Sequence, residues 1–174
     1  SATQSAIKGV ADAALDGVDR ATRDEVTLVD FDPEGEAKIV AAALYAASDL
    51  PDGQLLDVAR RMSSADRAAV LAAYVGDRTN RRHKPGRAFE RTGYRFDVLS
   101  DYGAFRDLQR HRLLTIEWQD LTPTHGFNEP AAIEEAGALA EWREVMEASA
   151  ALHDALHDAG LDRAAPYAVA MAYR

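Results

Sequence analysis

Apolar residues recur with helical spacing over most of the chain, which predicts a helix-rich protein. Ser63 followed by Asp66 three residues later is a typical start for one helix, and Pro130 in a first turn and Gly160 after a last turn delimit another. The segments expected to be helical are 1–22, 36–50, 54–62, 63–75 and 128–160.

Two segments instead alternate between apolar and polar residues, which predicts strands at 24–31 and 94–100. In the second strand, Tyr94, Phe96 and Val98 are expected on one face, with Arg95 and Asp97 on the other. A short helix should follow, and the run LLTIEW at 113–118 alternates again and predicts a third strand.

Length and composition fit one domain over residues 1–174, since 174 residues that are 47% hydrophobic and 28% charged can bury a core. We therefore expect a single α+β domain, helix-rich with a small antiparallel sheet. No apolar run approaches the roughly 20 residues that a membrane span needs, so we expect a cytoplasmic protein without a membrane partner. Because the chain begins at Ser1 and ends at Arg174 after an apolar stretch, we expect a longer chain with a C-terminal continuation.

Charge is distributed unevenly. Residues 78–112 hold 10 of the 20 Lys and Arg residues and only four acids, a local balance of +6 in a chain whose net charge is −9. A chain with this overall charge repels nucleic acid, so a concentrated basic segment suits a compact anion such as a phosphate. The alternative is that these arginines form ion pairs with the chain's own acids.

Arg106, Arg110, His111 and Arg112 lie close together in the basic segment and are candidates for phosphate binding, because a guanidinium donates two parallel hydrogen bonds and stays charged. His111 could equally be a buried structural residue bonded to Asp107. Elsewhere, His153 and His157 have the i, i+4 spacing of a metal pair but no evident third ligand, so we expect no metal site. Nor does the sequence contain a cysteine, a Walker motif or a dinucleotide-binding glycine motif.

Residues 90–121, ERTGYRFDVLSDYGAFRDLQRHRLLTIEWQDL, resemble the central signature of the flavin-dependent thymidylate synthases. Glu90, Tyr94, Phe96 and Arg106 match that signature without a gap, as does the Arg-His-Arg triplet at 110–112. Residues 26–48, VTLVDFDPEGEAKIVAAALYAAS, also resemble the opening strand, acidic turn and first helix of that family.

The resemblance implies an α+β subunit of a homotetramer, or a domain paired with a second similar one, that binds FAD and a pyrimidine nucleotide. In that family, reduced flavin mediates methyl transfer from methylenetetrahydrofolate to deoxyuridine monophosphate. By position, the resemblance implies FAD contacts from Arg95, Arg110, His111 and Arg112. The implied nucleotide contacts are Arg106, Asp107, Arg110 and Asp120.

Several of these positions depart from the family pattern. Arg91 stands where the family has His, Arg95 where it has Thr, and Asp107 where it has Gln. Asp120 replaces a serine, and no residue is assigned as catalytic. Two hypotheses therefore remain open: a divergent flavin- and nucleotide-binding protein, whose activity as an enzyme is left open, and a non-catalytic structural or interaction domain.

Overall fold

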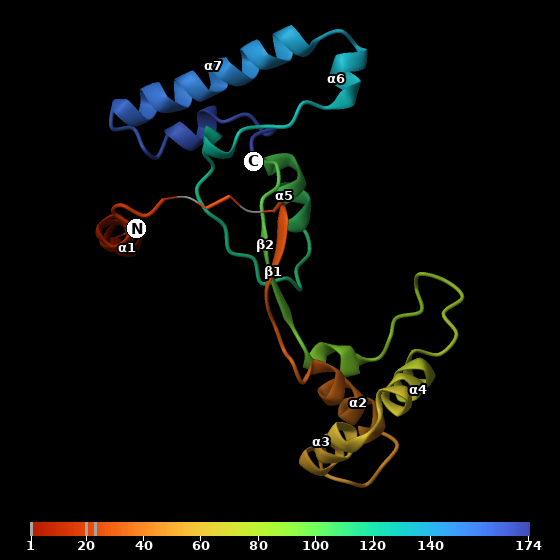
Figure 1. The fold of residues 1–174 in the computed structure, drawn as a ribbon. Helices are drawn as coiled ribbons and strands as arrows, with labels where there is room; N and C mark the ends of the chain where they lie inside the picture. Colours follow the sequence, from red (N-terminus) through yellow and green to blue (C-terminus); the bar gives the residue numbers. More distant parts are fainter. Residues whose placement is uncertain (1, 20, 23) are drawn as a thin grey trace.

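The computed structural model describes residues 2–19, 21–22 and 24–174 and consists of one small sheet with helices gathered mainly beyond its two ends (Figure 1). The α-helices are α1 (Ala2–Ala14), α2 (Gly35–Tyr45), α3 (Asp52–Arg61), α4 (Ser64–Val75), α5 (Tyr102–Leu108), α6 (Ala131–Glu135) and α7 (Leu139–Asp158). Short 3₁₀ helices are η1 (Arg87–Arg91), η2 (Pro123–His125) and η3 (Ala165–Ala168). The strands are β1 (Val26–Phe31) and β2 (Tyr94–Val98).

A helical cluster forms at one end of the sheet from α2, α3, α4 and η1 (Figure 1). Val40, Ala41, Leu55 and Ala59 are buried at its centre, with Leu44 and Leu71 among the residues packed around them. The predicted cap of α4 is confirmed, since the Ser63 side chain accepts a hydrogen bond from the Asp66 N–H at 3.1 Å. We call this group the N-terminal cluster.

A second apolar cluster, the C-terminal cluster, lies at the other end and joins α7 to the chain terminus. Met146, Val169 and Tyr173 are buried in it, and Leu121, Phe127 and Trp142 pack against them. The hydroxyl of Tyr173 donates a hydrogen bond of 2.6 Å to the carbonyl oxygen of Met146. The last residues of the chain are therefore held by both packing and hydrogen bonding.

Strands β1 and β2 pair antiparallel between the two clusters (Figure 1). The directly opposed pairs are Val26 with Val98, Thr27 with Asp97, Leu28 with Phe96, Asp30 with Arg95, and Phe31 with Tyr94. A bulge between Leu28 and Asp30 takes up Val29 and keeps the apolar pairs in phase on one face. The sequence-based prediction of two strands is confirmed, and so is the predicted separation of apolar from polar residues in β2.

Three sequence-based predictions need correction. The helix expected over 1–22 is α1, which ends at Ala14; Ser1 and Arg20 lie outside the described residues. The helix expected over 128–160 is divided into α6 and α7, because Gly137 adopts a left-handed φ of 71° between them. No strand forms at 113–118; these residues are irregular.

The fold class is confirmed as α+β, helix-rich with a small two-stranded antiparallel sheet. The assignment of residues 1–174 to one domain stays a prediction. Over the described ranges, every helix is too short or too polar to cross a bilayer.

Candidate functional site

The residues expected to bind an anion lie on and beyond α5 and are exposed. Arg106 is in the last turn of α5, but the helix ends at Leu108, so Arg110 lies in the turn that follows. The expectation that Arg106 and Arg110 share one side of a helix is therefore wrong. Arg110, His111, Arg112 and Asp120 are all exposed, and none of them lines either of the two hollows described below.

Two of the candidate arginines form ion pairs with acids of the chain. Arg110 pairs with Asp107, three residues earlier. Arg95 lies 3.7 Å from Asp30, its cross-strand neighbour, with both side chains largely exposed. The proposed bond between His111 and Asp107 is absent from the described structure, where the Asp107 carboxylate faces Arg110 instead. These two ion pairs are what the alternative hypothesis predicts, in which the arginines pair with the chain's own acids.

Two other candidate arginines, Arg106 and Arg112, have no carboxylate partner in the described structure. Arg106 contacts the sulfur of Met171 at 3.6 Å through Nη1, a weak interaction for a guanidinium. Within residues 2–19, 21–22 and 24–174, Arg112 makes no hydrogen bond or ion pair through its side chain, and neither does Asp120. Of the candidate arginines at 95, 106, 110 and 112, Arg106 and Arg112 are therefore the two without a carboxylate partner in the described structure.

The sheet presents an uncovered apolar surface. Opposed residues of an antiparallel pair share a face, so one face carries Val26, Leu28, Phe31, Tyr94, Phe96 and Val98. We call these six residues the apolar sheet face. Their exposed fractions lie between 43% and 65%, and the rings of Tyr94 and Phe96 are 6.4 Å apart on it. A two-stranded sheet is marginally stable alone in water, so this face needs cover.

The total accessible surface of the chain also indicates that part of it needs cover. The accessible area is 13397 Å². A compact monomer of 18.9 kDa exposes about 8,300 Å², so roughly 5,000 Å² more is exposed than one compact domain requires. The sequence showed the alternation of the strands but carried no signal that their apolar face lacks a cover.

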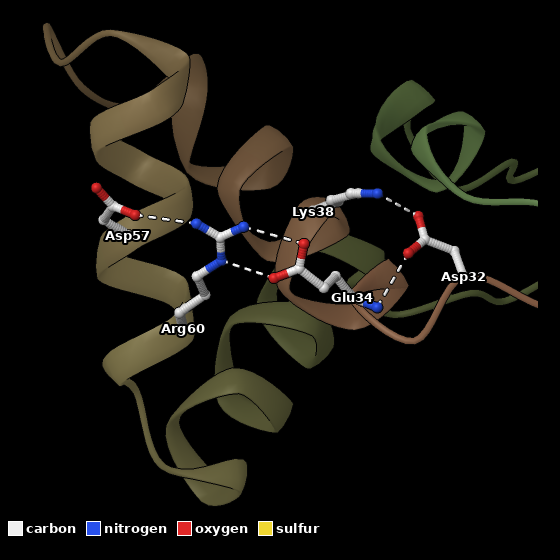
Figure 2. A network of polar contacts seen from close by, with 5 residues as sticks. All are labelled: Asp32, Glu34, Lys38, Asp57 and Arg60. Carbon is white, nitrogen blue, oxygen red and sulfur yellow. Dashed lines mark hydrogen bonds and ion pairs between the residues drawn. The ribbon is translucent and has the colours of Figure 1, made fainter.

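A polar network that sequence reasoning missed fixes the acidic turn before α2 (Figure 2). The Asp32 carboxylate accepts hydrogen bonds from Lys38 Nζ at 2.5 Å and from the Glu34 N–H at 3.0 Å. Arg60, from α3, donates to both oxygens of Glu34 at 2.7 and 2.9 Å and to Asp57 at 3.1 Å. The network thus ties the turn to α3.

This network changes the acidity of its members. The hydrogen bond from Lys38 is the main cause that lowers the pKa of Asp32, and the bond from Arg60 lowers the pKa of Glu34. The same bond, together with Asp57, raises the pKa of Arg60. Beside it lies a hollow of about 320 Å³ lined by Glu34, Glu36, Arg60 and Arg67, among others. Since Arg67 Nε binds Glu36 at 2.5 Å, both arginines are neutralised and the hollow is a poor anion site.

A second hollow, of about 330 Å³, lies between the start of α5 and α7. Asp101, Trp142 and Met171 are among its lining residues. The Trp142 Nε1–H is buried and has no hydrogen-bond partner in the described structure. The sequence showed Trp142 only as part of an apolar stripe, and no pattern indicated its unpaired donor.

The two histidines at metal-pair spacing have separate acidic neighbours. His153 Nδ1 lies 2.9 Å from Asp154 Oδ1, and His157 Nδ1 lies 2.8 Å from Asp162 Oδ1. No group of three or more His, Cys, Asp or Glu residues suited to a metal was found among the residues the structure describes.

Comparison with known proteins finds similarity to three proteins named UPF0159. The chain is 38% identical over 141 residues to one of Chlamydia pneumoniae, covering 81% of this chain and 27% of that protein. It is 41% identical over 122 residues to one of Chlamydia muridarum, covering 70% and 23% respectively. It is also 34% identical over 154 residues to one of Thermoplasma acidophilum, covering 87% and 31%.

The chain therefore spans about a quarter to a third of the length of the curated relatives it matches. No family model matches the chain, and no solved structure does. The assignment to the flavin-dependent thymidylate synthases is wrong by these comparisons, because the relatives carry the UPF0159 name and no model of a synthase family matches. Methyl transfer was implied by that resemblance alone, and it stays a prediction on which the comparisons do not bear.

Proposed function

We propose that this chain is an interaction domain, which completes its fold by docking the apolar sheet face against another protein surface. The observation that supports this function is the exposure of all six residues of that face in a sheet of only two strands in the described structure. Burying apolar surface is the main favourable term in protein association. The six residues are also contiguous along two paired strands, and a contiguous exposed apolar patch is typical of docking surfaces.

Two measurements together test this function. They are hydroxyl-radical labelling of Tyr94 and Phe96 and the mass of the particle in solution. We expect one of two results: an assembly in which the two rings are protected, or a monomer in which both are labelled and a hydrophobic dye binds. A monomer in which both rings are protected would contradict the proposal, because the chain would then cover its own sheet. Tyr167, which is 92% exposed, is the internal reference for full labelling.

Binding of a phosphate-bearing ligand is the second candidate function. Arg106 and Arg112 support it, because their guanidinium groups lie in the basic segment without a carboxylate partner in the described structure. FAD and a pyrimidine nucleotide are the ligands to test, by titration followed by absorbance and calorimetry. Binding at micromolar concentration should be lost in Arg112→Ala and kept in Arg143→Ala, since Arg143 binds Glu129 at 2.6 and 2.8 Å. Absence of binding to the unchanged chain would exclude this candidate.

A further inference from the structure

Residues 114–120, which we call the arm, form an irregular segment with the side-chain alternation of a strand. Leu114, Ile116 and Trp118 alternate with Thr115 and Glu117. Within the described structure, the backbone of residues 115–120 makes no hydrogen bond to other backbone groups. Trp118 contacts the ring of Phe105 at 5.7 Å between centroids, yet it is still 66% exposed. The arm therefore has the composition of a strand but lacks a ladder partner.

The outer edge of β2 lacks a partner as well. The described sheet has the order β1-β2, so each strand is paired on one side only. The backbone hydrogen bond beside β2, from the Leu99 N–H to the Glu25 carbonyl at 2.8 Å, is also on the β1 side. An open edge of this kind is a template for another strand.

We propose that the arm of one copy of this chain pairs antiparallel with β2 of a second copy. This inference rests on the proposed interaction function and names the occupant of the sheet. If Glu117 lies opposite Arg95, the remaining pairs are fixed by the antiparallel register. They are Leu114 with Val98, Thr115 with Asp97, Ile116 with Phe96, and Trp118 with Tyr94.

This register matches apolar residues with apolar residues at every position on the apolar sheet face. It also sets the carboxylate of Glu117 against the guanidinium of Arg95. The Arg95 side chain is 71% exposed, and its contact with Asp30 is long, at 3.7 Å, so it can also face Glu117. Opposed apolar pairs and opposed charges both stabilise neighbouring strands. A shift by one residue would place Glu117 opposite an aromatic ring, and a shift by two would place it opposite Gly93 or Asp97, so only this register combines the apolar pairs with the Glu117–Arg95 pair.

The exposed area favours a second copy over a short peptide. Obligate homodimers bury about 2,000–5,000 Å² in total, which is about 1,000–2,500 Å² per copy. Each copy of this chain exposes roughly 5,000 Å² beyond a compact monomer of its mass, enough to supply its half of such an interface. A reciprocal exchange of two arms is symmetric, so both copies gain a third strand and neither arm stays unpaired. The far end of the arm is held in its own copy by Leu121, which packs in the C-terminal cluster.

Disulfide trapping between copies tests the register directly, because the chain contains no cysteine of its own. Arg95→Cys and Glu117→Cys are made in separate proteins, one with a mass tag, and are mixed and mildly oxidised. Opposed residues of a strand pair have a Cα separation that a disulfide can span. We expect a cross-linked dimer that contains one copy of each protein. The matched control mixes Glu117→Cys with Lys84→Cys, in an exposed loop, and should give none.

A second experiment distinguishes loss of strand pairing between copies from loss of folding. Leu99 directs its N–H at β1, so in β2 the backbone groups of Tyr94, Phe96 and Val98 face the outer edge. Ile116→Pro removes the N–H that the register sets against Phe96 and that the single chain leaves unbonded, so it should abolish the dimer in sedimentation while the circular dichroism of the helices is unchanged. Lys84→Pro, also at an unbonded N–H, should keep the dimer. A monomeric unchanged chain with labelled rings would overturn the arm exchange while leaving the interaction function standing. A disulfide formed within one chain carrying both cysteines, at high dilution, would overturn it too.

Discussion

The guanidinium of Arg60 binds the carboxylate of Glu34 through two parallel hydrogen bonds, from Nε to Oε1 at 2.7 Å and from Nη2 to Oε2 at 2.9 Å. These residues are 26 positions apart, and the pair connects α3 to the turn that starts α2. A forked geometry of this kind depends on the planar arginine side chain, which lysine does not reproduce.

Stability should therefore fall in acid. The pKa values of Asp32, Glu34 and Glu129 are lowered from 3.8, 4.5 and 4.5. A carboxyl group with a lowered folded pKa stabilises the protein above its unfolded pKa, and this stabilisation is lost as pH falls through the folded value. Denaturant unfolding measured from neutral pH to below 3.8 should show the decline.

Arg60→Gln should flatten the part of this decline that belongs to Glu34, because the main cause of its lowered pKa is then removed. The effect at neutral pH should be small, since exposed ion pairs stabilise proteins weakly. Arg61→Gln, at the next position of α3, is the control and should leave the pH dependence unchanged. An equal change in both variants would argue against the role given to the fork.

Gly35→Ala should destabilise the protein, whereas Gly53→Ala should not. A Cβ at Gly35 would lie 2.4 Å from the Thr92 hydroxyl oxygen and 3.0 Å from its Cβ, whereas a Cβ at Gly53 meets nothing within 4 Å. Overpacking of a buried position lowers stability by about 1–3 kcal/mol. Gly53 lies in the first turn of α3, where alanine should raise stability by about 0.4–1 kcal/mol. Chemical denaturation of both variants measures the contrast; equal changes would contradict it.

The sequence predicted those features that depend on neighbouring residues. The alternation in 94–100 placed β2, and Ser63 with Asp66 placed the start of α4, because both signals are local. It failed where the outcome depends on distant groups. Residues 113–118 alternate like a strand, but alternation does not supply a partner. Gly137 is compatible with a helix, yet here it adopts a φ that divides α6 from α7.

At the candidate site, too, the sequence indicates contacts between neighbouring residues but not between distant ones. The pairing of Arg110 with Asp107 spans three residues and is within reach of sequence reasoning. The Arg60 and Glu34 fork spans 26, and no periodicity reports it. Exposure of the apolar sheet face was equally out of reach, because a sequence pattern shows which residues share a face but not what covers them.

Tyr173→Phe should lower stability, because it removes the 2.6 Å hydrogen bond to the Met146 carbonyl oxygen. The tyrosine is 3% exposed, and burial raises the pKa of its hydroxyl, so the neutral donor persists at neutral pH. Loss of one such bond lowers the free energy of unfolding by about 0.5–1.5 kcal/mol. Tyr167→Phe, at a residue that is 92% exposed, is the matched control and should have no effect. Equal denaturation midpoints for the two variants would contradict this role.

Met146→Ala and Val40→Ala should destabilise different parts of the molecule. Met146 is 2% exposed in the C-terminal cluster, and Val40 is 0% exposed in the N-terminal cluster. Truncating a buried methionine to alanine lowers stability by about 2–5 kcal/mol. Amide exchange should therefore accelerate in α7 and η3 for Met146→Ala, and in α2 and α3 for Val40→Ala.

The control for Met146→Ala is Val145→Ala, its neighbour on α7, which is 62% exposed and should leave exchange unchanged. Faster exchange of both clusters in both core variants would show one cooperative unit. Separate responses would show that each cluster opens on its own. The sheet between them would then depend for its order on whatever covers its apolar face, so protection of β1 and β2 should rise with protein concentration if a second copy provides that cover.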